Sequence, residues 1–434
     1  MIDRVDLLRR LVQVDTTNPP GNEAPAIRIV QEVLENAGIS VELVSQDPAR
    51  PNLVARLAGE GTSPPLLLQG HVDVVPITGQ SWSHDPFGGE TVDGFVWGRG
   101  TLDMKGPIVM MIDALLRLAS DPTPPAGDII LAVLADEEMQ GTLGARFLVE
   151  QHPSLFDGVR FAIGEFGGFP FDLDGKRFYP IQIAERIGVV FQLTIEGPAG
   201  HGSLPIRGGA MAKLGRILRI LDRRRLPIHL TPATRLMVEG LQQHTTGATR
   251  VALGRLLDER SAAGTLRLLR TRLGMLEPMF RNTVSPTVVR GGDKHNVIPA
   301  RITLGLDGRM LPGFTPEQFE AELRELVGPE CDIRMTTDGA TTPPEPDLGL
   351  FPLLAEALLE QDPDGIPIPF LLPAVTDGRW FAQLGIQPYG FTPITLPEGF
   401  DFQQTVHGAD ERIPVAALGF GADALYSVIR RYAF

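Results

Sequence analysis

Short apolar runs that alternate with helical stretches constrain the fold of this chain more than any other feature. Strands are predicted at residues 52–57, 64–76, 128–138 and 159–168, with helices at 24–39 and 104–120. Apolar runs separated in this way by helices are typical of a mostly parallel sheet with helices on both faces. The expected fold class is therefore α/β, and in such sheets ligands bind beyond the carboxyl ends of the strands.

A different pattern fills residues 185–341. A strand, a helix, two strands, a helix and a strand follow one another there, which is the order of a ferredoxin-like split βαβ domain. We interpret it as a second domain inserted into the first, which then comprises residues 1–184 and 342–434. Leucine and methionine stripes at helical spacing predict an extra helical segment at about 226–282, interpreted as added packing or an interface.

The charge balance limits the partners of the chain. Its 434 residues carry a formal net charge of -14, so the summed field repels phosphate, and neither nucleic acid nor a membrane is an expected partner. The first residues lack the pattern of a signal peptide, and no window reaches about 20 uninterrupted apolar residues. The single cysteine, Cys331, excludes an internal disulfide and fits a reducing, cytoplasmic location.

Metal-ligating side chains follow the predicted strands or lie in glycine-rich turns. The five candidates are His71, Asp103, Glu138, Glu165 and His407. Because the strands place these residues at one edge of the sheet, their side chains can converge although they are far apart in the sequence. Imidazole and carboxylate groups suit Zn²⁺, Mn²⁺ or Co²⁺. Carboxylates crowded at one edge would repel one another, and two divalent ions remove that repulsion.

Each of these residues also has a simpler explanation when it is taken alone. A single histidine after a strand is more often a turn residue than a ligand, and a Glu-Glu pair usually begins a helix. Five such residues at successive strand ends of one sheet are harder to explain in this way, so the joint pattern favours a metal site.

Five ordered motifs carry a resemblance to a known family. They are GHVDVVP, WSHDPFGG, GRGTLDMKG, ADEEMQG and HGADERIP. The chain resembles the di-zinc metallopeptidase and aminoacylase family of acetylornithine deacetylase, succinyl-diaminopimelate desuccinylase, aminoacylase and carboxypeptidase S, and it looks closest to the carboxypeptidase S branch. The resemblance implies a zinc-peptidase catalytic domain and gives the inserted domain the role of a lid and dimerisation domain.

The resemblance also implies a role for each residue of the cluster. Asp103 would bridge two ions, His71 and Glu165 would complete one site, and Glu138 and His407 would complete the other. Glu137 would be the general base. Asp73 would accept a hydrogen bond from the imidazole of His71 and fix its tautomer. The family has a cis peptide after its bridging aspartate, which corresponds here to the bond from Asp103 to Met104.

Three residues of the inserted domain match family motifs. His201, in GPAGHGSLP, would reach the active site of the partner subunit and polarise the scissile carbonyl, so a homodimer is expected. Asn296 and Arg309 match substrate-binding residues, and an arginine fork suits a carboxylate. A turn residue is the alternative for His201, and a surface ion pair with Asp307 is the alternative for Arg309.

The expected function is metal-dependent hydrolysis of an amide or peptide bond next to a free carboxylate. The substrate would be a small peptide or an N-acyl amino acid, and carboxypeptidase, dipeptidase and deacylase remain open because one sequence does not show the shape of a pocket. The expected cofactors are two divalent ions, with Zn²⁺ as the first candidate and Co²⁺ or Mn²⁺ as alternatives. Other possibilities are a catalytically silent binding protein of the same fold and a two-metal phosphoesterase.

Overall fold

The computed structural model describes residues 2–268, 274–337, 339–340 and 342–434. The chain divides into two compact units. Unit 1 comprises Met1–Ile183, Pro346–Phe370 and Thr376–Phe434, and unit 2 comprises Ala184–Glu345 and Leu371–Val375. Residues 269–273 of the predicted extra segment, and residue 341 at the predicted end of the insert, lie outside the described residues.

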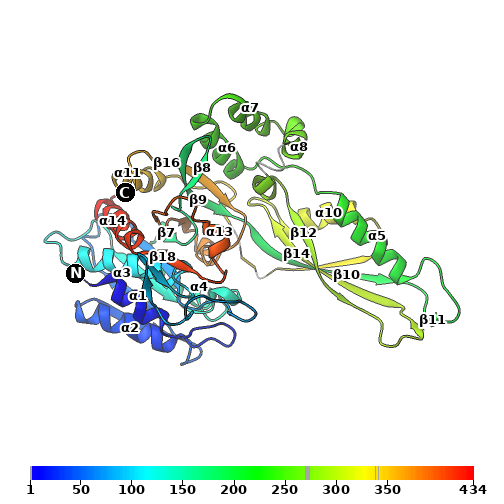
Figure 1. Cartoon of the computed structure of the whole chain (residues 1–434), viewed down its shortest axis with the longest axis horizontal. Coiled ribbons are helices and arrows are strands. Elements are labelled where there is room, and N and C mark those ends of the chain that lie inside the picture. Colours follow the sequence, from blue (N-terminus) through cyan, green and yellow to red (C-terminus); the bar gives the residue numbers. More distant parts are fainter. Residues whose placement is uncertain (1, 269–273, 338, 341) are drawn as a thin grey trace. The chain divides into compact units, whose positions relative to one another are not determined.

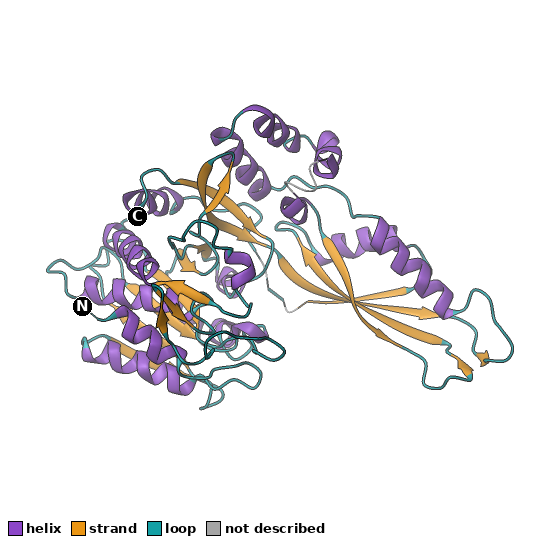
Figure 2. Cartoon of the chain, viewed as in Figure 1, coloured by secondary structure: helices purple, strands orange, loops and turns teal. Residues whose placement is uncertain are grey.

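Unit 1 is built on one large mixed sheet with helices packed on it (Figures 1 and 2). Its first part contains α1 (Arg4–Val12), α2 (Ala24–Asn36), β1 (Ser40–Val44), β2 (Asn52–Leu57), β3 (Leu66–His71), β4 (Thr91–Val92), β5 (Phe95–Trp97), α3 (Lys105–Ala119), β6 (Ile129–Leu134), η1 (Glu137–Met139), α4 (Ala145–Gln151), η2 (Pro153–Phe156), β7 (Phe161–Gly164), β8 (Phe171–Leu173) and β9 (Lys176–Glu185). Its second part contains α11 (Phe351–Gln361), β16 (Ile366–Leu372), α12 (Gly378–Phe381), η4 (Ala382–Leu384), β17 (Gln387–Gly390), α13 (Phe402–Thr405), β18 (Arg412–Pro414) and α14 (Val415–Arg431). Strands β9 and β16 each continue for two residues into unit 2.

The strands of the large sheet run in the order β1-β2-β6-β3-β7-β17-β9-β16. Neighbours from β6 to β17 are parallel, and β1, β2 and β9 add antiparallel pairs. Every residue of β3 and β6 is buried, because their leucine and isoleucine side chains are covered by helices on both faces. The predicted α/β class with a mostly parallel sheet is therefore confirmed.

Parallel β3, β6 and β7 end at the same edge of the sheet, and this edge positions the site. Helix α3 starts just beyond it and packs against β3, β6 and α14. A small sheet in the order β18-β5-β4 lies in the same unit. Strand β5 precedes the turn that contains Asp103, and β18 follows His407 in the chain. The antiparallel pairing of β5 with β18 therefore ties the Asp103 turn to the His407 loop.

Unit 2 contains the predicted split βαβ arrangement and the extra helices. Its elements are β10 (Ile187–Glu196), β11 (Gly200–His201), α5 (Ala210–Arg223), α6 (Pro232–His244), α7 (Gly247–Leu256), α8 (Glu259–Leu268), η3 (Gly274–Phe280), β12 (Thr283–Arg290), β13 (Val297–Ile298), β14 (Arg301–Met310), α10 (Pro316–Val327) and β15 (Asp332–Thr337). The four-stranded antiparallel sheet has the order β12-β14-β10-β15. Helices α5 and α10 cover one of its faces (Figure 1).

The core of unit 2 follows from alternation along its strands. The odd residues of β10, from Ile187 to Ile195, are buried, and they pack with the apolar side of α5 and α10. Helix α10 begins with a capping box between Thr315 and Gln318. Among the described residues, no helix is both long and apolar enough to cross a membrane.

Candidate metal centre and active site

Strand ends and loops of unit 1 bring the five predicted ligands together. His71 is the last residue of β3, Glu165 follows β7, and Glu138 lies in η1 just beyond β6. Asp103 lies in the turn before α3, and its peptide bond to Met104 is cis, as the resemblance implied. His407 lies in the loop between α13 and β18.

Asp103 stands between two histidines. Its Oδ1 lies 3.1 Å from Nε2 of His71, and its Oδ2 lies 2.9 Å from Nε2 of His407. On the first side, Nε2 of His71 is also 3.5 Å from Oε2 of Glu165. On the second side, Nε2 of His407 is 3.3 Å from Oε1 of Glu138. His71, Asp103 and Glu165 form one set of three ligand atoms, which lie within 4.8 Å of one another. Asp103, Glu138 and His407 form a second set of the same kind, so Asp103 belongs to both sets.

The donor atoms fit divalent cations. Oε1 of Glu138 and Oε2 of Glu165 are buried and accept no hydrogen bond within the described part of the chain. Buried carboxylate oxygens without donors are costly, and a cation at each of the two sets would supply the missing partner. Imidazole nitrogen with carboxylate oxygen is a donor set suited to Zn²⁺, Mn²⁺ or Co²⁺.

The His71 ring is oriented by its own chain. Its Nδ1 donates to the main-chain oxygen of Asp73 at 3.0 Å, so in the neutral ring the lone pair belongs to Nε2, which faces Asp103 and Glu165. The sequence led us to expect the carboxylate of Asp73 as the acceptor, but its Oδ1 lies 3.5 Å from Nδ1. The main-chain oxygen is the closer acceptor, and the side chain of Asp73 is engaged by the main-chain N–H groups of Glu137 and Glu138.

The Asp73 carboxylate instead holds the turn that carries the acids. Its two oxygens accept the main-chain N–H groups of Glu137 and Glu138, each at 3.1 Å. Asp73 is fully buried, and the side-chain amide of Asn18 donates a third hydrogen bond to it at 2.9 Å. Glu137 lies in a further group with His71 and Glu138, so its carboxylate faces the space beside the candidate metal ligands.

Burial and mutual charge shift the pKa values of the cluster. Burial raises the pKa of Glu165 to about 8, and the negative charge of Asp103 adds to that effect. Burial, followed by the charge of Glu165, raises the pKa of Glu137 well above its usual value. Burial acts to lower the pKa of His407, but the nearby carboxylates of Asp103 and Glu138 outweigh it and raise that pKa to about 10. These shifts predict that the cluster retains protons near neutral pH, which bound cations would displace.

Sequence reasoning missed the residues that support the cluster. Asn18 bridges Asp73 and Asp136, which are 2.9 and 3.0 Å from its side-chain nitrogen. Arg50 pairs with Asp136 at 3.1 Å and with buried Glu23. Asn18 lies before the first of the five motifs, and no periodicity or spacing in the sequence assigns it a contact.

Glu411 supports the Asp103 turn and the His407 loop. Its Oε1 accepts the main-chain N–H groups of Leu102 and Asp103 at 2.8 and 3.2 Å, and its Oε2 pairs with Arg99 at 2.6 Å. A second nitrogen of Arg99 donates to the main-chain oxygen of His407. This buried pair therefore joins the Asp103 turn to the His407 loop.

Asp377, at the start of α12, is a further acid near the cluster. It is 1% exposed, and neither carboxylate oxygen has a hydrogen-bond partner within the described residues. Burial raises its pKa to about 7, and the charges of Asp73 and Asp136 act in the same direction. Asp377 lies outside the five motifs, and the sequence assigned it no role.

The remaining predicted residues lie in unit 2. His201 is exposed on β11, and its Nδ1 accepts the main-chain N–H of Ser203. Asn296 lies beside it, because its main-chain oxygen accepts the N–H of Gly202 at 2.8 Å. Arg309, on β14, makes a two-pronged ion pair with Asp307 at 2.8 and 3.0 Å, which is the surface pair left open as an alternative.

Comparisons with known proteins agree with this geometry. The sequence matches Peptidase family M20/M25/M40 over residues 67–431. It is 28% identical over 386 residues to probable carboxypeptidase S-like 2 of Dictyostelium discoideum, covering 84% of this chain and 71% of that protein. It is 25% identical over 436 residues to aminoacylase-1 of Sus scrofa, covering 96% and 92%.

The fold is similar to that of an M20 family metallo-carboxypeptidase from Sulfolobus solfataricus. That structure superposes with a TM-score of 0.71 at 14% identity, over 99% of each chain. The matched range of the family includes the elements that position all five candidate ligands. The chain therefore belongs to peptidase family M20/M25/M40 and is a metallohydrolase that acts on C–N bonds.

Proposed function

We propose that this protein hydrolyses an amide or peptide bond next to a free carboxylate, in a small peptide or an N-acyl amino acid. The proposal depends on the position of Asp103, because its two carboxylate oxygens face two separate sets of ligand atoms. Glu137 lies beside these ligand atoms. The similarity to proteins named probable carboxypeptidase S-like 2 and aminoacylase-1 supports the proposal.

Two divalent ions are the proposed cofactors, with Zn²⁺ first and Co²⁺ or Mn²⁺ as alternatives. His71 and Glu165 would hold one ion, Glu138 and His407 would hold the other, and Asp103 would bridge them. Bound ions of this kind polarise a carbonyl and lower the pKa of water toward neutrality.

Glu137 is the proposed general base. A carboxylate with a raised pKa can take a proton from the attacking water and return it to the leaving nitrogen near neutral pH. Its position is held through the main chain, because Asp73 accepts the N–H groups of Glu137 and Glu138. Proton transfer by a group placed in this way contributes about 100-fold to 10,000-fold in rate.

His201 is the proposed donor to the scissile carbonyl. Because its Nδ1 accepts a hydrogen bond from the main-chain N–H of Ser203, the neutral ring carries its proton on Nε2, which can donate to a carbonyl oxygen. Asn296, on the adjoining turn, is a proposed substrate contact. Arg309 is proposed to bind the substrate carboxylate, and for that it must share its guanidinium with Asp307.

The direct experiment is a hydrolysis panel with each metal added back. N-acyl amino acids and dipeptides should turn over, and their C-terminal amides should react at least about tenfold more slowly, because an amide offers no negative charge to the guanidinium of Arg309. Glu137→Gln should retain metal and lose turnover by about 100-fold or more. Glu60→Gln, an exposed acid of the same unit, is the control and should match the wild type.

Two outcomes would contradict the proposal. Near-normal rates for Glu137→Gln would make the base assignment wrong. A metal-loaded protein that bound these compounds but cleaved none would favour a catalytically silent binding protein.

A homodimer through unit 2 is proposed as the active assembly. Strand β12 supports it, because it is an edge strand whose outer residues are exposed, with Val288 and Val289 at 45% and 54%. If His201 acts across the subunit boundary, mixed His201→Ala and Glu137→Ala chains should regain part of the wild-type activity. A labelled chain verifies that the subunits have exchanged. If exchange occurs and no activity is recovered, the proposal that His201 acts across the subunit boundary is contradicted.

A further inference from the structure

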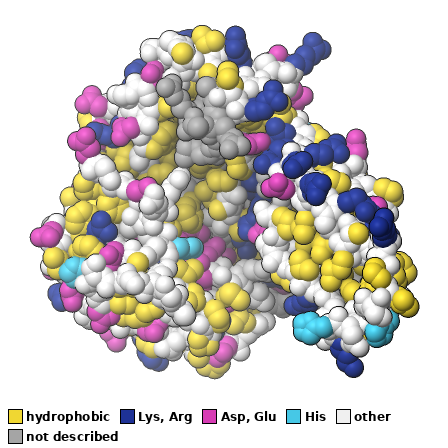
Figure 3. All heavy atoms as spheres, turned by 45° about the vertical axis from the view of Figure 1, so that its right-hand side comes forward, with side chains coloured by type: hydrophobic (Ala, Val, Ile, Leu, Met, Phe, Trp, Pro, Cys, Tyr) yellow, Lys and Arg dark blue, Asp and Glu magenta, His cyan; other side chains and the backbone are white. Residues whose placement is uncertain are grey.

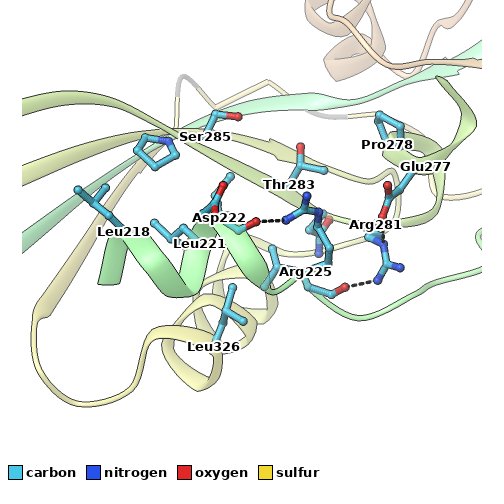
Figure 4. Close-up of a pocket in the computed structure, with 14 residues that line it drawn as sticks. Leu218, Leu221, Asp222, Arg225, Glu277, Pro278, Arg281, Thr283, Ser285 and Leu326 are labelled. Atoms are coloured by element: carbon cyan, nitrogen blue, oxygen red, sulfur yellow. Dashed lines mark hydrogen bonds and ion pairs between the residues drawn. The ribbon is translucent and has the colours of Figure 1, made fainter. Parts of the chain in front are cut away.

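A cavity of about 490 Å³ opens in unit 2 and is built from that unit alone. The end of α5, the segment from η3 into β12, and α10 supply its walls (Figure 4). Sites for small molecules in proteins have volumes of about 300 to 1,000 Å³, so its size suits a ligand. No residue of the metal cluster lines it.

One end of the cavity is apolar. Leu218, Leu221 and Leu326 lie together on one side of the close-up (Figure 4). Leu221 and Leu326 belong to the core between α5 and α10, so they form a fixed floor. Val284, on β12, continues this surface. An aliphatic chain laid on these side chains would lose contact with water and gain their packing.

The other end holds two guanidinium groups. The side chain of Arg281 is only 11% exposed; its Nη1 donates to the main-chain oxygen of Leu226, and its Nε pairs with Glu277 at 3.2 Å. Arg225 donates from Nη1 to main-chain oxygens alone. Within the described part of the chain, no acceptor is recorded for Nη2 of either arginine.

The surroundings favour an anion at this end. Burial lowers the pKa of Arg281, and the positive charge of Arg225 contributes in the same direction, so the two groups are close enough to repel. Helix α5 is followed by Arg224 and Arg225, and Lys and Arg side chains crowd the face of unit 2 shown in Figure 3. Of the two acids in the lining, Glu277 is already engaged by Arg281, and Asp222 is exposed.

We propose that this cavity binds an aliphatic carboxylate, with its chain on the leucine floor and its carboxylate on Arg225 and Arg281. A guanidinium fork matches a carboxylate, and the separation of apolar and cationic ends matches an amphiphile. The ligand is a free aliphatic acid or an N-acyl amino acid, which share this chemistry. The inference concerns binding outside the catalytic cluster and stands independently of the proposed hydrolysis.

Calorimetric titration of decanoate into the metal-loaded protein tests the proposal. We expect one saturable site, with acetate and decanol each binding at least about tenfold more weakly, because each lacks one half of the ligand. A parallel titration with N-decanoylglycine in the Glu137→Gln protein distinguishes the two sources of the carboxylate. Because N-decanoylglycine also suits the proposed catalytic site, a ligand is assigned to the cavity only if Arg225→Ala weakens its binding.

Variants locate the site. Arg225→Ala should weaken decanoate binding by about tenfold, whereas Arg224→Ala should not change it, because Arg224 is equally exposed but does not line the cavity. Ser285→Trp should fill the mouth and abolish binding, and thermal melting checks that each variant folds.

A metal-deficient His71→Ala protein separates this cavity from the catalytic cluster. Binding that survives in His71→Ala and is about tenfold weaker in Arg225→Ala supports the cavity. Binding lost in His71→Ala and unchanged in Arg225→Ala, or no saturable binding to the wild type, would overturn the inference.

Discussion

Asp73 shows how one buried carboxylate organises the site at the scale of a residue. It is two residues from His71 and orients the ring through its main-chain oxygen, while its side chain receives the turn that carries Glu137 and Glu138. One residue therefore positions a candidate ligand and the candidate base. Hydrogen bonds from N–H groups to a buried carboxylate are among the stronger ones in proteins.

Replacing Asp73 with asparagine tests this role. An amide offers only one oxygen, so one main-chain N–H of the turn would face an N–H donor instead of an acceptor. We expect a loss of about 1 to 3 kcal/mol in the free energy of unfolding, together with a lower kcat. Urea unfolding and initial rates measure the two effects, and Asp157→Asn, at an exposed position, is the control. Equal stability of Asp73→Asn and wild type would show that the turn is held by other contacts.

The turn after β6 is the element on which the catalytic geometry depends. Asp136 and Gln140 have φ values of 70° and 80°, and Gly141, at 68°, closes the turn by donating to the main-chain oxygen of Asp136. A Cβ added at Gly141 would lie 2.5 Å from Oδ1 of Asp377. Glycine is therefore required here by both conformation and space.

Comparing Gly141→Ala with Gly38→Ala should separate the conformational cost of a left-handed backbone from the steric cost of an added Cβ. Gly38 has a φ of 77° and nothing within 4 Å of an added Cβ, so Gly38→Ala carries only the conformational cost of about 1 kcal/mol. Gly141→Ala should lose more, about 2 to 4 kcal/mol, and should lower kcat as Glu137 moves. Melting curves and rates check both. Equal losses in the two variants would mean that the contact with Asp377 is relieved without effect.

Local patterns predicted the elements for a physical reason, but the predicted strands, which end at 76 and 138, run past His71 and Leu134, where β3 and β6 end. The buried runs 64–76 and 128–138 contain β3 and β6, because apolar side chains on both faces mark a central strand. His71 and Glu138 could be placed at the same edge from that pattern alone. The same pattern could not place Asn18, Arg99 or Glu411 near the cluster. A hydrogen bond between residues more than 50 positions apart leaves no periodicity in the sequence.

At the scale of the whole molecule, the charge of the chain is unevenly distributed. The net charge of -14 led us to exclude polyanionic partners from the sequence alone. Unit 2 nevertheless carries arginines around α5 and the cavity beside it. A net charge averages over the two units and hides this difference. The unit that carries the cluster concentrates carboxylates instead, which is where cations are needed.

Metal titration into the metal-free protein, followed by calorimetry at pH 6 and pH 8, tests the central claim most directly. At pH 6 the carboxyl of Glu165 retains its proton, because its pKa is raised to about 8, and a cation must displace it. Affinity should therefore rise with pH, by about tenfold per pH unit for each proton displaced. Two ions per chain, and none or one in Asp103→Ala, is the predicted result. At most one ion in the wild type, or two ions retained in Asp103→Ala, would contradict a shared aspartate between two cations.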